Sequence, residues 1–98
     1  MNKKETINSI LLNRAEFCYN IADFENQRGK IGKIKKSAVY ESAAQKLSSM
    51  SFKNWKNMIK KSYFILGKQI ATENFRSEIS EILIKNEFAV LSEILELI

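Results

Sequence analysis

The chain has no histidine and no proline, and it has only three glycines and one cysteine among its 98 residues. The absence of histidine removes the usual general base, the Ser-His and Cys-His nucleophile arrangements and most zinc sites. The single cysteine, Cys18, excludes an intrachain disulfide framework, which suits a reducing cytoplasm. Without proline and with little glycine, the chain favours long helices over a turn-rich β fold.

Other signals are also missing. No apolar run approaches the roughly 20 residues that a membrane-spanning helix needs, and the N-terminus lacks the apolar core of a signal peptide. Neither a GxxxxGK[ST] loop nor a GxGxxG motif occurs. Cys18 falls among apolar residues, where a buried thiol is expected. The sequence therefore predicts one soluble, cytoplasmic domain over residues 1–98, with no catalytic residue, metal site or cofactor.

Acidic residues are scarce in the middle of the chain. Residues 28–68 hold eleven lysines and arginines against the single acid Glu41, whereas residues 69–98 hold six glutamates and two basic residues. Such a concentration of positive charge in residues 28–68 indicates a surface that attracts anions. Internal pairing of this basic segment with the acidic C-terminal segment is the alternative, and the two can coexist.

Apolar residues recur at three-to-four spacing, which predicts an all-α fold, a compact bundle of four to five helices. Thr6, Ser37 and Ser51 are the expected N-caps. The expected helices cover residues 5–27, 37–48, 52–75 and 77 onward. The expected inward face of the first helix comprises Ile7, Ile10, Leu11, Phe17, Cys18, Ile21 and Phe24. Arg14 falls inside that face, and we expect its stem to lie along the core while its head reaches solvent.

The last segment has more apolar residues than one helix face needs, so it is either central to the bundle or a homodimer contact. Asn86 either divides it into two short helices or lies within a single one.

The stretch RGKIGKIKKS, residues 28–37, is expected to break the helix, because its glycines can adopt positive φ angles. Its Gly29-Lys30-Ile31-Gly32 is similar to the GxxG loop with which KH domains clamp a nucleic-acid backbone. No alternating run is present to build the sheet of a KH domain. We therefore expect a GxxG-like phosphate contact in a helical protein, with backbone amides and lysines meeting the phosphate oxygens.

The segment 37–71 resembles a helix-turn-helix. The first helix contains small residues and is closed by Leu47, a short turn follows, and Ser51 caps a basic second helix. The resemblance places Trp55 and Met58 against the first helix and directs Phe52 outward, together with a row of polar residues. Its turn is about one residue longer than usual and lacks the customary glycine. The alternative is two bundle helices with a solvated lysine face.

The leading interpretation is a non-catalytic nucleic-acid-binding protein, DNA or RNA, acting as an accessory regulator or as a subunit of a larger nucleoprotein complex. Small helical subunits of CRISPR effector complexes are an analogy in size and charge. Lysine outnumbers arginine, which favours backbone contacts over base reading. The candidate binding residues are Arg28, Lys30, Lys33, Lys35, Lys36, Lys53, Lys56, Asn57, Lys60, Lys61 and Lys68. Phe64, among these lysines, either stacks on an exposed base or packs in the core.

The alternative function is a protein-binding inhibitor, such as a bacteriocin or toxin immunity protein or a phage anti-defence protein. Such proteins are often compact helical bundles of about this size. The basic surface would then meet an acidic protein or an anionic membrane face.

Overall fold

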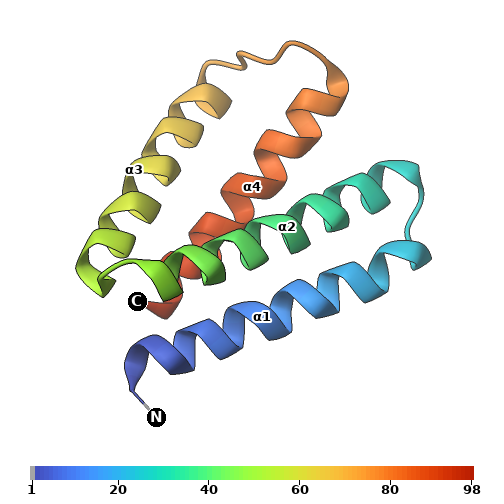
Figure 1. Ribbon diagram of the computed structural model, residues 1–98. Coiled ribbons are helices and arrows are strands. Elements are labelled where there is room, and N and C mark those ends of the chain that lie inside the picture. The colour runs from blue at the N-terminus through green and yellow to red at the C-terminus, as the bar shows by residue number, and fades with distance from the viewer. Residues whose placement is uncertain (1) are drawn as a thin grey trace.

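The computed structural model describes residues 2–98, and these residues form only helices and their connections (Figure 1). The elements are α1 (Lys3–Ile21), the 3-10 helix η1 (Ala22–Phe24), α2 (Gln27–Ser49), α3 (Phe52–Ala71) and α4 (Glu78–Leu97). The expected all-α bundle of four to five helices is confirmed. None of the helices in this part of the chain is both long and apolar enough to cross a membrane.

The helices form two hairpins that lie across one another (Figure 1). α1 and α2 run antiparallel, and α3 and α4 form the second hairpin. α2 and α3 diverge from the turn that joins them, and α4 lies between them and contacts both. The shortest dimension of the molecule is 19 Å, which matches two layers of helices, each about 10 Å thick.

Each α-helix begins with a side-chain N-cap. The oxygens of Asn2, Asn26, Ser51 and Ser77 accept hydrogen bonds from the backbone amide three residues further on. These bonds satisfy amides that lack a partner inside the helix. The prediction of Ser51 as a cap is confirmed, whereas Thr6 is not the cap of α1, because Asn2 begins that helix four residues earlier.

The largest correction concerns RGKIGKIKKS, which does not break the helix. It lies within the 23-residue α2, and no residue of this stretch has a positive φ. Ser37, the expected N-cap, is instead a buried residue of α2 whose hydroxyl donates to the Ala15 carbonyl of α1 at 2.7 Å. The prediction of a hinge was wrong because contacts with neighbouring helices hold these residues in the helical conformation.

Two glycines lie where helices approach closely. A Cβ on Gly32 would stand 2.9 Å from the Asn86 side-chain nitrogen in α4, and a Cβ on Gly67 would stand 3.2 Å from a ring carbon of Phe88. Gly67 therefore borders α4. Asn86 lies inside a continuous α4 and donates to the Ile82 carbonyl at 2.7 Å, so it does not divide the helix.

The buried face of α1 is narrower than predicted. Ile7, Leu11, Ala15 and Cys18 are buried against α2, but Phe17 is 63% exposed and Phe24 is 89% exposed. The spacing of the four buried residues sets the contact stripe, and Phe17 lies about 100° away from Cys18 around the helix. Phe24 lies beyond the end of α1, in η1.

The core does not extend along the whole α3–α4 hairpin. On α3 only Trp55 and Ile59 are buried, and on α4 only Val90, Leu91 and Ile94. No residue from 60 to 89 is buried, although this stretch contains many apolar side chains. We call residues 60–89 the distal hairpin.

Candidate nucleic-acid interface

α3 presents a continuous basic face. Its 20 residues include five lysines and no acid. Trp55 and Ile59 turn the opposite side of the helix into the core, and the Trp55 indole donates to the Ala43 carbonyl of α2 at 3.0 Å. At 100° per residue, this anchoring leaves one side of α3 toward solvent. That side carries Lys53, Lys56, Asn57, Lys60, Lys61, Phe64 and Lys68, of which only Lys56 is half-buried and the others are exposed.

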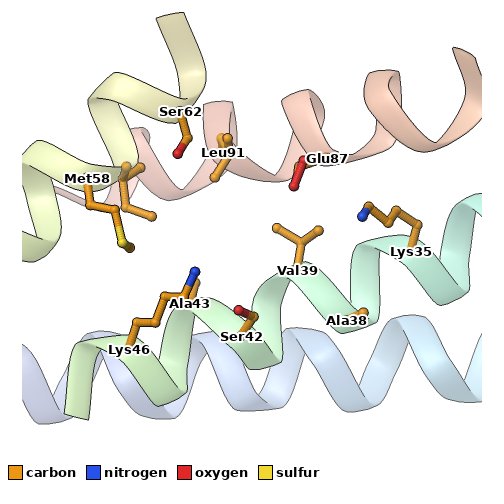
Figure 2. A pocket seen from close by; sticks show the side chains of 11 residues that line it. Lys35, Ala38, Val39, Ser42, Ala43, Lys46, Met58, Ser62, Glu87 and Leu91 are labelled. Carbon is orange, nitrogen blue, oxygen red and sulfur yellow. The ribbon is translucent and has the colours of Figure 1, made fainter. Parts of the chain in front are cut away.

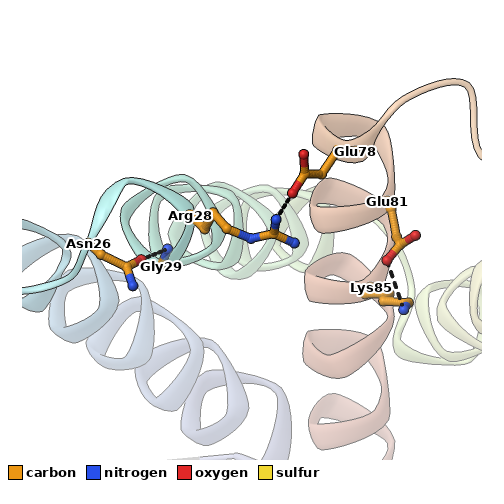
Figure 3. A network of polar contacts seen from close by, with 6 residues as sticks. All are labelled: Asn26, Arg28, Gly29, Glu78, Glu81 and Lys85. Atoms are coloured by element: carbon orange, nitrogen blue, oxygen red, sulfur yellow. Dashed lines mark hydrogen bonds and ion pairs between the residues drawn. The ribbon is translucent and has the colours of Figure 1, made fainter.

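The α3 lysines have no carboxylate partner. Within residues 2–98, none of the five lies within 4.0 Å of an acidic oxygen, whereas four basic residues elsewhere do. Arg28 of α2 pairs with Glu78 of α4 (Figure 3), and Lys30 pairs with Asp23 at 3.1 Å. Internal pairing, the alternative raised by the charge distribution, therefore applies to the start of α2 and not to α3.

Two of the lysines on α3 lie over aromatic rings. The Lys56 ammonium is 5.0 Å from the centre of the Phe52 ring, and the Lys68 ammonium is 5.2 Å from the centre of the Phe64 ring. Such contacts are weak at exposed sites, about 0.5–1 kcal/mol, so both ammonium groups keep access to solvent anions. Phe52 is half-buried and its ring stacks on Trp55, with 6.0 Å between ring centres. The outward position of Phe52, which only the helix-turn-helix resemblance implied, was wrong.

The lysines predicted to lie on one loop belong to α2, and their side chains point in several directions around this helix. Lys33 and Lys36 line a groove of about 400 Å³ together with Arg14, Glu93 and Glu96. Arg14, half-exposed as expected, reaches to 3.8 Å from Glu93 of its own chain. This groove has acids on its α4 side, so its net charge is smaller than that of the α3 face.

A second cleft lies between α2, α3 and α4 (Figure 2). It has a volume of about 310 Å³, and Lys35 and Lys46 line its α2 side. Glu87 lies across the cleft from Lys35 (Figure 2). Met58, predicted to pack against the preceding helix, is half-buried and lines the α3 side of the cleft. The predicted basic residues therefore do not form one surface. Some line the two grooves, others lie on the α3 face, and Arg28 and Lys30 form ion pairs at the start of α2.

The Gly29–Gly32 segment, which is similar to the GxxG loop of KH domains, is part of α2 and forms no loop. The Gly29 amide donates to the Asn26 side chain at 2.9 Å (Figure 3), and Gly32 lies in the interior of α2 against Asn86. The glycine backbone is thus engaged inside the protein, and a loop that cradles phosphate was the wrong expectation. For the helix-turn-helix resemblance, the structure shows a connection of only Met50 and Ser51 between α2 and α3.

Sequence reasoning found the α3 lysines but missed the partners of Arg28 and Arg14. Their carboxylates, Glu78 and Glu93, lie 50 or more positions away in the chain, and no local pattern marks such pairs. Tyr40 was also missed: it is 2% exposed and its hydroxyl donates to Glu93.

No group of three potential metal-ligating side chains occurs in residues 2–98. Comparisons with models of known protein families, with curated proteins and with solved structures found no match to this chain.

Proposed function

We propose that this protein binds the phosphate backbone of a nucleic acid through the outer face of α3, without catalysing a reaction. The observation that carries the proposal is the set of five α3 lysines, none of which has a carboxylate within 4.0 Å in residues 2–98. Lys53 and Lys68 are separated by about 22 Å along the helix, at 1.5 Å per residue. A polyanion that follows α3 can therefore meet several ammonium groups at once.

The charges define the kind of binding. Lysine ammonium groups act as point charges toward phosphate, and bidentate recognition of base edges is a property of arginine. Binding is therefore tolerant of sequence and releases counterions. Five phosphate contacts give a slope of log K against log salt of about −3.5 for a single strand and about −4.5 for a duplex.

The test is a fluorescence-anisotropy titration of labelled oligonucleotides at about 50 and about 200 mM salt. We expect affinity in the micromolar range or tighter at the lower salt, and at the higher salt a loss of about 100-fold for a single strand and about 500-fold for a duplex. Replacing two lysines by Lys56→Glu with Lys60→Glu should weaken binding by about 50-fold or more at low salt. The helical circular-dichroism signal should remain; if this pair disturbs folding, Lys60→Glu with Lys61→Glu changes two exposed residues instead.

The matched control is Lys33→Glu with Lys36→Glu, which changes the net charge equally but alters the groove that also holds Glu93 and Glu96. We expect a smaller effect than from the α3 pair. An equal loss from both pairs would show that only net charge matters, and absence of binding at low salt would refute the proposal.

Two settings suit such a protein: an accessory regulator, or a small subunit of a larger nucleoprotein complex. A protein-binding inhibitor is the second candidate, favoured by the exposed aromatic residues Phe17 and Tyr19 in the last turns of α1 and Phe24 in η1. Exposed aromatic side chains are common anchors of protein interfaces. Absence of nucleic-acid binding in the titration would favour this second function.

A further inference from the structure

We propose that Phe64 is a base-stacking residue, so that the ligand of the α3 face is single-stranded nucleic acid. This inference rests on the proposed function and specifies its ligand. Phe64 is 64% exposed on the outer side of α3, with its ring away from the core. A large apolar ring in this position gains free energy only when another apolar surface covers it.

Phe64 is exposed even though other aromatic side chains pack on one another at the same position along the hairpin. Its neighbour Tyr63 fills the space toward α4 and stacks on Phe88, with 4.6 Å between ring centres and 14° between ring planes. Gly67 leaves room for the Phe88 ring on the same side. Tyr63 and Gly67 therefore make the α3–α4 contact at this level, and Phe64 takes no part in it.

The surroundings of Phe64 are cationic. Lys60, Lys61 and Lys68 precede or follow it by three or four positions, which places all of them beside it on the helix surface. The Lys68 ammonium lies 5.2 Å from the centre of the ring. No acid occurs on α3. An exposed aromatic ring with three lysines beside it on the helix surface offers a nucleotide two matching contacts, one for its base and one for its phosphates.

The other exposed aromatic side chains of the described residues lack these surroundings. Phe24, the most exposed at 89%, lies between Asp23 and Glu25 in the chain. Phe17 is about as exposed as Phe64, at 63%, but in the groove that it lines Glu93 and Glu96 offset the charge of Arg14, Lys33 and Lys36. Tyr19 lies beside Glu16 and Glu41, in a shallow pocket without lysine or arginine. Only Phe64 thus combines an exposed ring with an acid-free basic face.

This combination distinguishes single strands from duplexes. In a duplex the faces of the bases are stacked on one another, and a protein helix meets phosphates and groove edges. In a single strand the base faces are accessible, and aromatic residues within a basic surface bind them with little sequence preference. The ring of Phe64 therefore adds affinity for a single strand and adds none for an intact duplex.

The experiment compares three labelled probes of about 20 units at low salt: oligothymidylate, an abasic strand of equal length and a duplex. The wild-type protein should bind oligothymidylate about ten-fold or more tightly than the abasic strand. Phe64→Ala should remove that difference and leave binding of the abasic strand and the duplex unchanged. Phe17→Ala, the control of equal exposure, should change none of the three affinities.

A spectroscopic variant, Phe64→Trp, keeps a stacking ring at the same position. Trp55 is 0% exposed, so fluorescence quenching by oligothymidylate reports on the introduced indole. We expect quenching by oligothymidylate and none by the abasic strand.

Three outcomes would overturn the inference: an unchanged preference for oligothymidylate in Phe64→Ala, a duplex affinity that depends on Phe64, or a change of oligomeric state in Phe64→Ala measured by light scattering. Each leaves backbone binding through the α3 lysines standing. A protein that binds none of the probes would contradict the proposed function as well, so the two failures are distinguishable.

Discussion

The α1–α2 hairpin and the distal hairpin contain similar helices but differ in burial. Along the first, Ile7, Leu11, Tyr40 and Leu47 are at most 3% exposed, and buried polar contacts such as Ser37 to Ala15 join the two helices. In the distal hairpin no side chain is buried, and Phe64, Ile65 and Ile79 are more than half exposed. The difference arises because α4 packs on α2 and α3 together only at its C-terminal half.

This comparison separates the residues that hold the fold from those available for binding. Trp55, Val90 and Ile94 join the two hairpins and are completely buried, and burial of this kind supplies most of the stability of a small domain. Lys60, Lys61, Phe64 and Lys68 lie on the distal hairpin. We therefore expect substitutions that alter binding to change the stability of the fold very little.

The largest effect should come from truncating equivalent side chains at the two ends of α4. Ile94 is 0% exposed and Ile79 is 56% exposed. We expect Ile94→Ala to lower the free energy of unfolding by about 2–5 kcal/mol and Ile79→Ala by less than about 0.5 kcal/mol. Urea denaturation followed by circular dichroism measures both. Comparable losses of unfolding free energy in the two variants would mean that the distal hairpin is covered in solution. The difference in burial between the two hairpins would then not hold.

An intermediate effect, with opposite signs, should come from the two glycines of α2. A Cβ on Gly32 would meet three side-chain atoms of the half-buried Asn86 at 2.9–3.1 Å, so Gly32→Ala should destabilise the protein by about 1–3 kcal/mol. A Cβ on Gly29 would meet the side chain of Glu25, which is exposed.

The added Cβ would lie 2.8 Å from the carboxylate of Glu25 and 3.0 Å from its Cβ. Because Glu25 is exposed and lies in the connection before α2, we expect it to shift by a few tenths of an ångström, so that Gly29→Ala stabilises α2 by up to about 1 kcal/mol. Thermal denaturation of both variants checks the signs. Destabilisation by Gly29→Ala with no effect of Gly32→Ala would instead favour a flexible hinge at RGKIGKIKKS.

The smallest effect should come from the ion pair that links α2 to the distal hairpin. The side chains of Arg28 and Glu78 are 61% and 66% exposed, and exposed pairs contribute at most about 1 kcal/mol. Glu78→Gln should therefore lower the free energy of unfolding by no more than about 1 kcal/mol, and less at high salt. A loss well above this value in a denaturation experiment would show that the pair positions the distal hairpin.

Much of the candidate site could be predicted from the sequence. The lysine face of α3 follows from the period of its apolar residues, with Trp55 and Ile59 on one side and the lysines on the other. The residues of 28–37 could not be placed in this way. Lys33, Lys35 and Lys36 lie in one basic run, but successive residues of a helix point about 100° apart, so they line two different grooves.

By itself, the sequence determined the helical class, the Ser51 cap and the amphipathic character of α3, because these depend on residues close together in the chain. The tertiary structure alone decided that Gly32 is a packing site instead of a hinge, that Ser37 bonds to α1 and that Arg28 meets Glu78. Each of these outcomes depends on atoms of a helix that is distant in the sequence. The residues next to a glycine or an arginine in the chain are the same whether or not such a distant helix contacts it.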